Sequence, residues 1–176
     1  MICRALAQAS DTETRCSLVR LLPVCADGPA LAALKTACSS SEANLKDAAV
    51  RTLADWPDAA AWDMLAELYR QSANSAYQAL ALRALVRLAE DANAHPNSAL
   101  FDRYRQLFSD ARNDDDRKLI LGALADAARP EALELVLPLL TNSVVRAEAE
   151  LAVKRIAESI KTQHPKEAAE ALQRLQ

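Results

Sequence analysis

Glycine and aromatic residues are scarce in this chain of 176 residues. Two positions are glycine, and Phe, Trp and Tyr together make up 4% of the sequence. Phosphate-binding loops and dinucleotide folds need closely spaced glycines, so this scarcity argues against both. A long apolar run is missing as well, because the stretch from Leu135 to Leu140 is broken by Pro138. The sequence therefore predicts no transmembrane helix and no membrane partner.

An excess of positive charge is also lacking. The chain has 21 Lys and Arg against 24 Asp and Glu, which gives a formal net charge of −3. Proteins that bind nucleic acid usually carry a positive excess that neutralises phosphates, so we expect no nucleic-acid partner. Residues 1–8 lack the charged start and apolar core of a signal peptide. The compartment stays open between cytoplasmic and exported, the latter through a signal upstream of this chain.

Alanine and leucine dominate what is present. They occupy 38 and 27 positions. Both residues rank high in helix propensity, and alanine is depleted in strands. The composition therefore predicts an all-α fold.

A six-residue pattern occurs five times along the chain. Its third place holds Val or Leu, and its sixth holds Leu or Ile. The fourth place is basic in four copies, Arg20, Arg51, Arg83 and Lys154, whereas the remaining copy has Gly122. The copies are residues 17–22, 48–53, 80–85, 119–124 and 151–156, whose starts lie 31, 32, 39 and 32 residues apart.

A second apolar pattern lies between these copies. Its residues are offset by 0, 3 and 7, which is one face of a helix. It begins at Leu31, Trp62, Phe101 and Leu133, with the same spacings as the first pattern. Two patterns with one spacing predict two helices per repeat, A and then B. We expect A helices at 29–38, 58–71, 98–110, 130–141 and 165–175, after a truncated A helix at 1–9, and B helices at 14–26, 44–56, 75–90, 115–128 and 145–160.

A two-helix repeat with Val-Arg or Leu-Arg in its second helix resembles the HEAT-repeat family, in particular the bacterial repeats of the phycobilisome-lyase type. Residues 45–59 and 80–89 carry the closest similarity. The resemblance implies an armadillo-like α-solenoid of about five two-helix repeats in a right-handed superhelix, forming one domain over 1–176. It implies an architecture and no activity. Because the first A helix is incomplete, we expect the chain to be part of a longer protein.

The four cysteines lie in the first quarter of the chain. No two of them are two residues apart, so the spacing does not fit a zinc site. The repeat places Cys3, Cys25 and Cys38 at core positions and Cys16 on the polar side. We expect thiols that pack as small hydrophobes, with a disulfide as the main alternative.

Other residues that could carry chemistry have structural interpretations. Five of the seven aromatic residues belong to the A-helix core pattern, whereas Tyr77 does not and is expected to be accessible. His95 and His164 each precede a proline in an expected loop. Asp114–Asp116 stand at a helix start, where acidic residues favour the helix dipole. Residues 91–97 lengthen one spacing to 39 as a tolerated insertion, with a functional loop as the alternative.

The polar face of the B helices is the expected binding surface. At about 100° per residue, Leu45 and Leu53 point to the core of the second B helix, and Asp47 and Arg51 point the opposite way. The same register gives the candidate partner-binding residues Arg20, Asp47, Arg51, Arg83, Arg87, Lys118, Glu150 and Lys154. In HEAT-like repeats a basic residue at this place often bonds a carboxylate inside the array, so a purely structural role is the competing interpretation.

The functional prediction is a non-enzymatic scaffold that presents a concave helical surface to a protein partner or to a neighbouring domain of the same chain. An anionic protein surface is the expected partner, and no cofactor or metal is expected. The alternative is a HEAT-like enzyme or accessory subunit, similar to bilin lyases or DNA glycosylases. Self-association is expected through an apolar patch of Ile2, Leu6, Leu18 and Leu22 beside the truncated helix.

Overall fold

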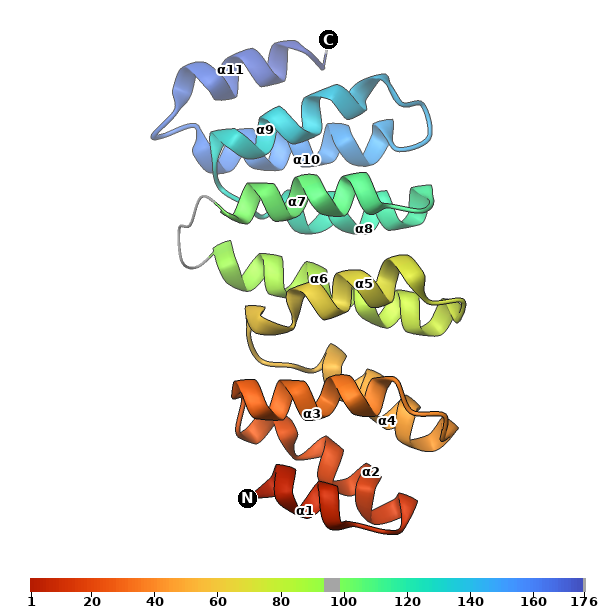
Figure 1. Ribbon diagram of the computed structural model, residues 1–176. Coiled ribbons are helices and arrows are strands. Elements are labelled where there is room, and N and C mark those ends of the chain that lie inside the picture. Colours follow the sequence, from red (N-terminus) through yellow and green to blue (C-terminus); the bar gives the residue numbers. More distant parts are fainter. Residues whose placement is uncertain (94–98, 176) are drawn as a thin grey trace. The chain divides into compact units, whose positions relative to one another are not determined.

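The structure is a computed structural model that describes residues 1–93 and 99–175 (Figure 1). Every regular element in those ranges is a helix, so the all-α prediction is confirmed. Within the single domain that the sequence predicts, the chain divides into two compact units, residues 1–88 and 89–176. The division lies next to the insertion at 91–97, which interrupts the regular repeat spacing. Most of that insertion lies outside the described residues, and each unit is described by itself.

The first unit holds five complete helices, two short 3-10 turns and most of a sixth helix. These are α1 (Ile2–Gln8), α2 (Thr12–Arg20), η1 (Leu22–Val24), α3 (Gly28–Cys38), α4 (Ala43–Ala54), η2 (Ala59–Ala61), α5 (Trp62–Gln71) and α6 (Ser75–Asn93). The second unit contains α7 (Ala99–Asp110), α8 (Asp114–Leu124), α9 (Pro130–Val136), η3 (Leu137–Thr141), α10 (Arg146–Ile160) and α11 (Pro165–Gln173). Each range expected to be helical from the sequence overlaps one of these helices.

Two helices change to 3-10 geometry at internal prolines. The B helix expected over 14–26 is α-helical only to Arg20 and continues as η1, which contains Pro23. The A helix expected over 130–141 is α-helical to Val136 and continues as η3, which contains Pro138. Proline has no N–H to donate and clashes with the preceding turn, so an α-helix cannot pass through it undisturbed.

Short polar side chains cap the helix starts. Asp11 and Asp27 each accept a hydrogen bond of 2.7 Å from a backbone N–H in the first turns of α2 and α3. Asn113 does the same for α8 at 2.9 Å, so the acidic residues 114–116 fill the first turn behind this cap. These bonds satisfy N–H groups that have no partner inside the helix.

The third and sixth places of the six-residue pattern form the centre of both cores. All of them are at most 2% exposed. They are Val19, Leu22, Val50, Leu53, Leu82, Leu85, Leu121, Leu124, Val153 and Ile156. Most of the aromatic residues pack with them, since Trp56, Trp62, Tyr69, Phe101 and Tyr104 are buried. Tyr77 is half-buried rather than freely accessible.

Within each unit, one pair of helices that carry successive copies of the pattern runs side by side in the same direction, α2 with α4 and α8 with α10. In the first unit, Glu42 at the start of α4 accepts a hydrogen bond of 2.5 Å from the Thr12 hydroxyl at the start of α2. In the second unit, Lys118 pairs with Glu148 at 3.1 Å near the starts of α8 and α10. Arg155 of α10 pairs at 2.6 Å with Asp126, just after α8. These contacts join residues about one repeat apart.

The first corrections concern Cys16 and Cys25, whose predicted environments are exchanged. Cys16 is 7% exposed, because α1 and α4 both pack against α2 and cover more of its surface than one neighbour would. Cys25 is exposed. It follows η1, where the helical register that aligned it with buried Trp56 no longer applies. All four cysteines are free thiols, so the disulfide alternative is not realised in this structure.

We expect Cys25 to react first with a maleimide at neutral pH. The thiolate is the reactive form, and Cys25 is the exposed cysteine. Cys16 is buried, and burial raises the pKa of the Cys38 thiol to about 11, so both should react slowly. Mass spectrometry of peptides after partial labelling gives the order, and labelling in urea should remove the differences. Labelling of Cys16 as fast as Cys25 in the folded chain would refute these placements.

The predicted apolar patch near the chain start also needs correction. Leu22 is fully buried, and Ile2, Leu6 and Leu18 are half-buried. Leu21 and Val24 are exposed instead, by 48% and 80%. Leu22 holds the sixth place of the pattern and packs in the core, whereas Leu21 and Val24 beside it face outward. In the described ranges, no helix combines the length and apolar character that crossing a membrane requires.

Candidate binding surface

The exposed face of α4 carries the ion pair at the centre of the predicted surface. Arg51 Nε donates a hydrogen bond of 2.8 Å to Asp47 Oδ2, one helical turn away. This hydrogen bond raises the pKa of Arg51 above its usual value. The Arg51 side chain is 62% exposed, so solvent screens the pair and it adds little to stability. Asp47 engages only the Nε–H, and a guanidinium has further donors for a ligand.

Arg87 has a different role from the other candidate residues. Its Nη2 group donates to the backbone carbonyls of Ala54 at 3.1 Å and Trp56 at 2.7 Å. The last carbonyls of a helix lack partners within the helix, and a cation there also complements the helix dipole. Arg87 therefore anchors α6 to the C-terminal end of α4, and we assign it to the fold rather than to a partner.

Arg20 and Arg83 remain available at the surface. Both are exposed, and neither makes an ion pair or a side-chain hydrogen bond to any residue that the structure describes. Arg20 and Arg51 line one hollow of about 340 Å³ between α2 and α4. Arg83 occupies the same place of the pattern on α6. The first unit thus presents a basic residue at this place on each of three helices.

Most of the candidate residues of the second unit form ion pairs with other side chains of that unit. The ion pair of Lys118 with Glu148 raises the pKa of Lys118, whereas hydrogen bonds from its own backbone and from Lys118 lower the pKa of Glu148. Glu150 accepts a hydrogen bond of 2.8 Å from Arg146 on the same helix. Lys154 is exposed and has no ion-pair partner within residues 1–93 and 99–175. It is the available cation among these candidates.

Groups that could hold a metal are not brought together in the described part of the chain. No three His, Cys, Asp or Glu residues there lie close enough to ligate one ion. His164 lies 3.6 Å from Glu167 in the first turn of α11, which is a local contact. His95 belongs to the residues that the structure does not describe. The exposed cations Arg20, Arg83 and Lys154 can bind carboxylates, and this is the binding chemistry that the surface supports.

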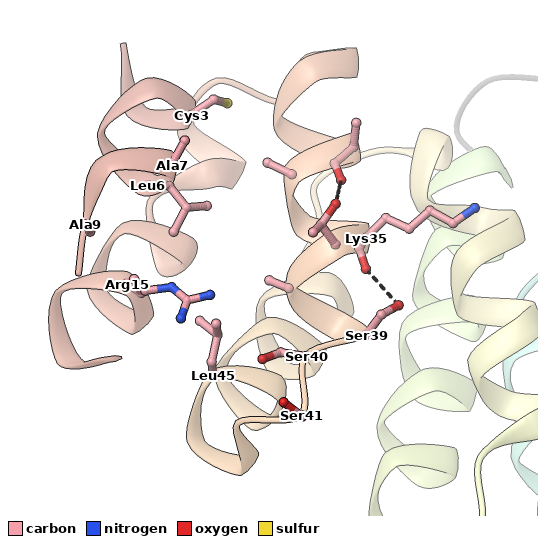
Figure 2. A pocket seen from close by; sticks show the side chains of 14 residues that line it. Cys3, Leu6, Ala7, Ala9, Arg15, Lys35, Ser39, Ser40, Ser41 and Leu45 are labelled. Carbon is pink, nitrogen blue, oxygen red and sulfur yellow. Dashed lines mark hydrogen bonds between the residues drawn. The ribbon is translucent and has the colours of Figure 1, made fainter. Parts of the chain in front are cut away.

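Sequence reasoning missed two grooves beside α3. The larger has a volume of about 990 Å³ and lies between α1, α3 and the start of α4. Figure 2 shows Leu6 and Ala7 on one side of it, with Arg15 and Leu45 at one end. The smaller, of about 530 Å³, lies between the α3–α4 pair and α5, and Tyr77 lines it. The two grooves share Lys35 and Ser39.

No protein-family model and no curated protein matches the chain. A de novo designed 16-helix transmembrane nanopore, solved by cryo-electron microscopy, is similar at 20% identity and a TM-score of 0.21. The alignment covers 99% of this chain and 51% of the nanopore chain, so the chain spans about half the length of that design. At this TM-score the similarity says nothing about fold or function.

Proposed function

We propose that the chain is a non-enzymatic interaction module that binds an acidic protein surface through arginines of its B helices. The observation that carries this proposal is the state of Arg20 and Arg83, which are exposed and have no partner among the described residues. They hold equivalent places on α2 and α6, the B helices before and after α4. Three successive repeats have an exposed arginine at the same place, Arg20, Arg51 and Arg83. The contact between α4 and α6 is made by Arg87, so we assign the exposed arginines to partner binding.

The proposal includes a HEAT-like architecture. Buried places recur at the repeat spacing, and contacts such as Thr12 with Glu42 and Lys118 with Glu148 join neighbouring B helices in parallel. These features support an α-solenoid of about five repeats with a right-handed superhelix, as the sequence resemblance implies. Such arrays offer extended faces to protein partners or to neighbouring domains.

The chemistry of the partner follows from arginine. A guanidinium presents donors in a planar fork that matches a carboxylate with two parallel hydrogen bonds. A row of such groups selects a surface rich in Asp and Glu. Exposed charges are screened by salt, so binding should weaken as ionic strength rises.

The charge-reversal variant R20E/R83E tests the proposal, with poly-L-glutamate as the probe. We expect the chain to bind this polymer in a salt-dependent manner and the variant to bind it at least about tenfold more weakly. The melting temperature should change little, because neither side chain makes an ion pair or a hydrogen bond to a residue that the structure describes. K166E/R174E, which makes the same change in net charge on α11, is the matched control and should bind nearly as well as the unmodified chain.

Two results would count against the proposal. Equal losses in R20E/R83E and K166E/R174E would show that only net charge matters. A lower melting temperature in R20E/R83E with unchanged binding would assign the arginines to a structural ladder.

A further inference from the structure

The larger groove beside α3 is lined by apolar side chains of α1, α3 and α4, and by Arg15, Lys35, Thr36 and Ser39–Ser41. Leu45 lies at one end of it and is 1% exposed, and Leu6 of α1 lines one side. The facing side of α3 contributes Ala33 and Ala37. α1 has no buried residue, so this short helix covers its neighbours without filling the space between them.

The size of this groove follows from two alanines. At the repeat spacing of 31, Ala33 and Ala37 of α3 correspond to Met64 and Leu68 of α5. Met64 and Leu68 face α3 and line the smaller groove, of about 530 Å³. Where α3 has the two alanines, the groove toward α1 is about 990 Å³. The side chains missing from α3 leave room for apolar groups from elsewhere.

Positive charge gathers around the two grooves. Arg15 lines the larger one and also pairs with Glu42. Lys35 extends from α3 away from α1, as Figure 2 shows, and with Lys46 it lines the smaller groove. Neither lysine has an ion-pair partner in the described chain. Glu67 is the acidic side chain that lines these grooves, so cations outnumber it.

From the apolar residues that line the groove and the two lysines, we infer that the groove between α1 and α3 is a docking site for an acidic peptide segment of a protein partner. A bulky apolar side chain of that segment enters the groove against Leu45, Ala33 and Ala37. Its flanking carboxylates pair with Lys35, which lines both grooves, and beyond α3 with Lys46 of α4, which lines the smaller groove. This site is separate from Arg20 and Arg83, and it stands or fails independently of the function proposed above.

Two fluorescein-labelled peptides test the inference, one with a leucine in the middle of a run of glutamates and one with serine in its place. We expect fluorescence anisotropy to show about tenfold tighter binding of the leucine peptide, because burial of a leucine side chain is worth that much in affinity. The serine peptide carries the same charge, so the ratio of the two affinities reports the groove alone.

Variants built from the chain's own α5 sequence should remove this preference. A33M/A37L places the α5 side chains on α3 and fills the groove, so both peptides should bind it equally. K35E/K46E should weaken both peptides at least about tenfold. R20E/R83E, the control, should keep the leucine preference.

The inference is overturned if the unmodified chain does not distinguish the two peptides. It is also overturned if A33M/A37L still prefers leucine. Should that variant fail to fold, A7M obstructs the same groove from the exposed side of α1 and must abolish the preference in a folded chain.

Discussion

Replacement of Leu53 by aspartate is expected to unfold the first unit. Leu53 lies at the sixth place of the repeated pattern and is 2% exposed. A carboxylate at a position this buried is largely removed from water, and its burial costs several kcal/mol or forces it to take up a proton. A domain of this size is stable by roughly 5–15 kcal/mol in total, so most of that stability would be lost.

Circular dichroism and tryptophan fluorescence measure the effect separately. Trp56 and Trp62 are the two tryptophans, and both are buried in the first unit. The L53D variant should therefore show tryptophan emission typical of water-exposed indole. L151D makes the same change at a leucine that is 66% exposed and should melt within a few degrees of the unmodified chain. A folded L53D would mean that the deduced core register is wrong.

Truncation of Arg87 is expected to produce the second largest loss. R87A removes charged donors from the carbonyls of Ala54 and Trp56 at the end of α4. Hydrogen bonds to charged groups contribute about 1.5–3 kcal/mol each. In the variant, water can bond the carbonyls that lose Arg87 and so restores part of this free energy. We expect R87A to lower the free energy of unfolding by about 2 kcal/mol.

Urea unfolding followed by tryptophan fluorescence checks this, because Trp56 reports directly on the end of α4. R83A, one helical turn away on the same helix, is the matched control. Its side chain is exposed and unpaired among the described residues, so its stability should stay within about 0.5 kcal/mol of the unmodified chain. Equal losses in R83A and R87A would contradict the distinction between a surface arginine and a structural one.

Helical periodicity explains why so much of the core could be predicted. A residue three places from another on a helix shares its face, so Val50 and Leu53 are buried together in one copy of the pattern, as are Val153 and Ile156 in another. Where the helix is not regular, the same reasoning fails. Cys25 lies beyond Pro23, and the face calculated for an ideal helix no longer describes it.

The role of Arg87 could not be read from its own helix. Its face angle places it at the edge of the polar surface, next to residues such as Arg83. Its partners are carbonyls of a different helix, and which helix end lies beside it is a property of tertiary packing. The sequence did hold a signal for such a partner. No glycine follows α4, and Arg51 is the basic residue of its last turn, so its last carbonyls need a donor from elsewhere.

The groove beside α3 depends on side-chain size rather than on polarity. Ala33 and Met64 are both apolar, so a pattern of apolar and polar places treats them as equal. A comparison of side-chain volumes at equivalent places of the repeat would have shown that α3 carries smaller side chains toward α1 than α5 carries toward α3. Small residues at a helix interface leave space unless the neighbouring helix moves closer.

Hydrogen–deuterium exchange of the chain with and without bound poly-L-glutamate tests the central proposal most directly. The measurement follows backbone amides and so locates the contact without any substitution. We predict slower exchange in α2, α4 and α6 around Arg20, Arg51 and Arg83, with α11 unchanged. Bound polymer without any slowing in those three helices would contradict the proposal that their arginines form the binding surface.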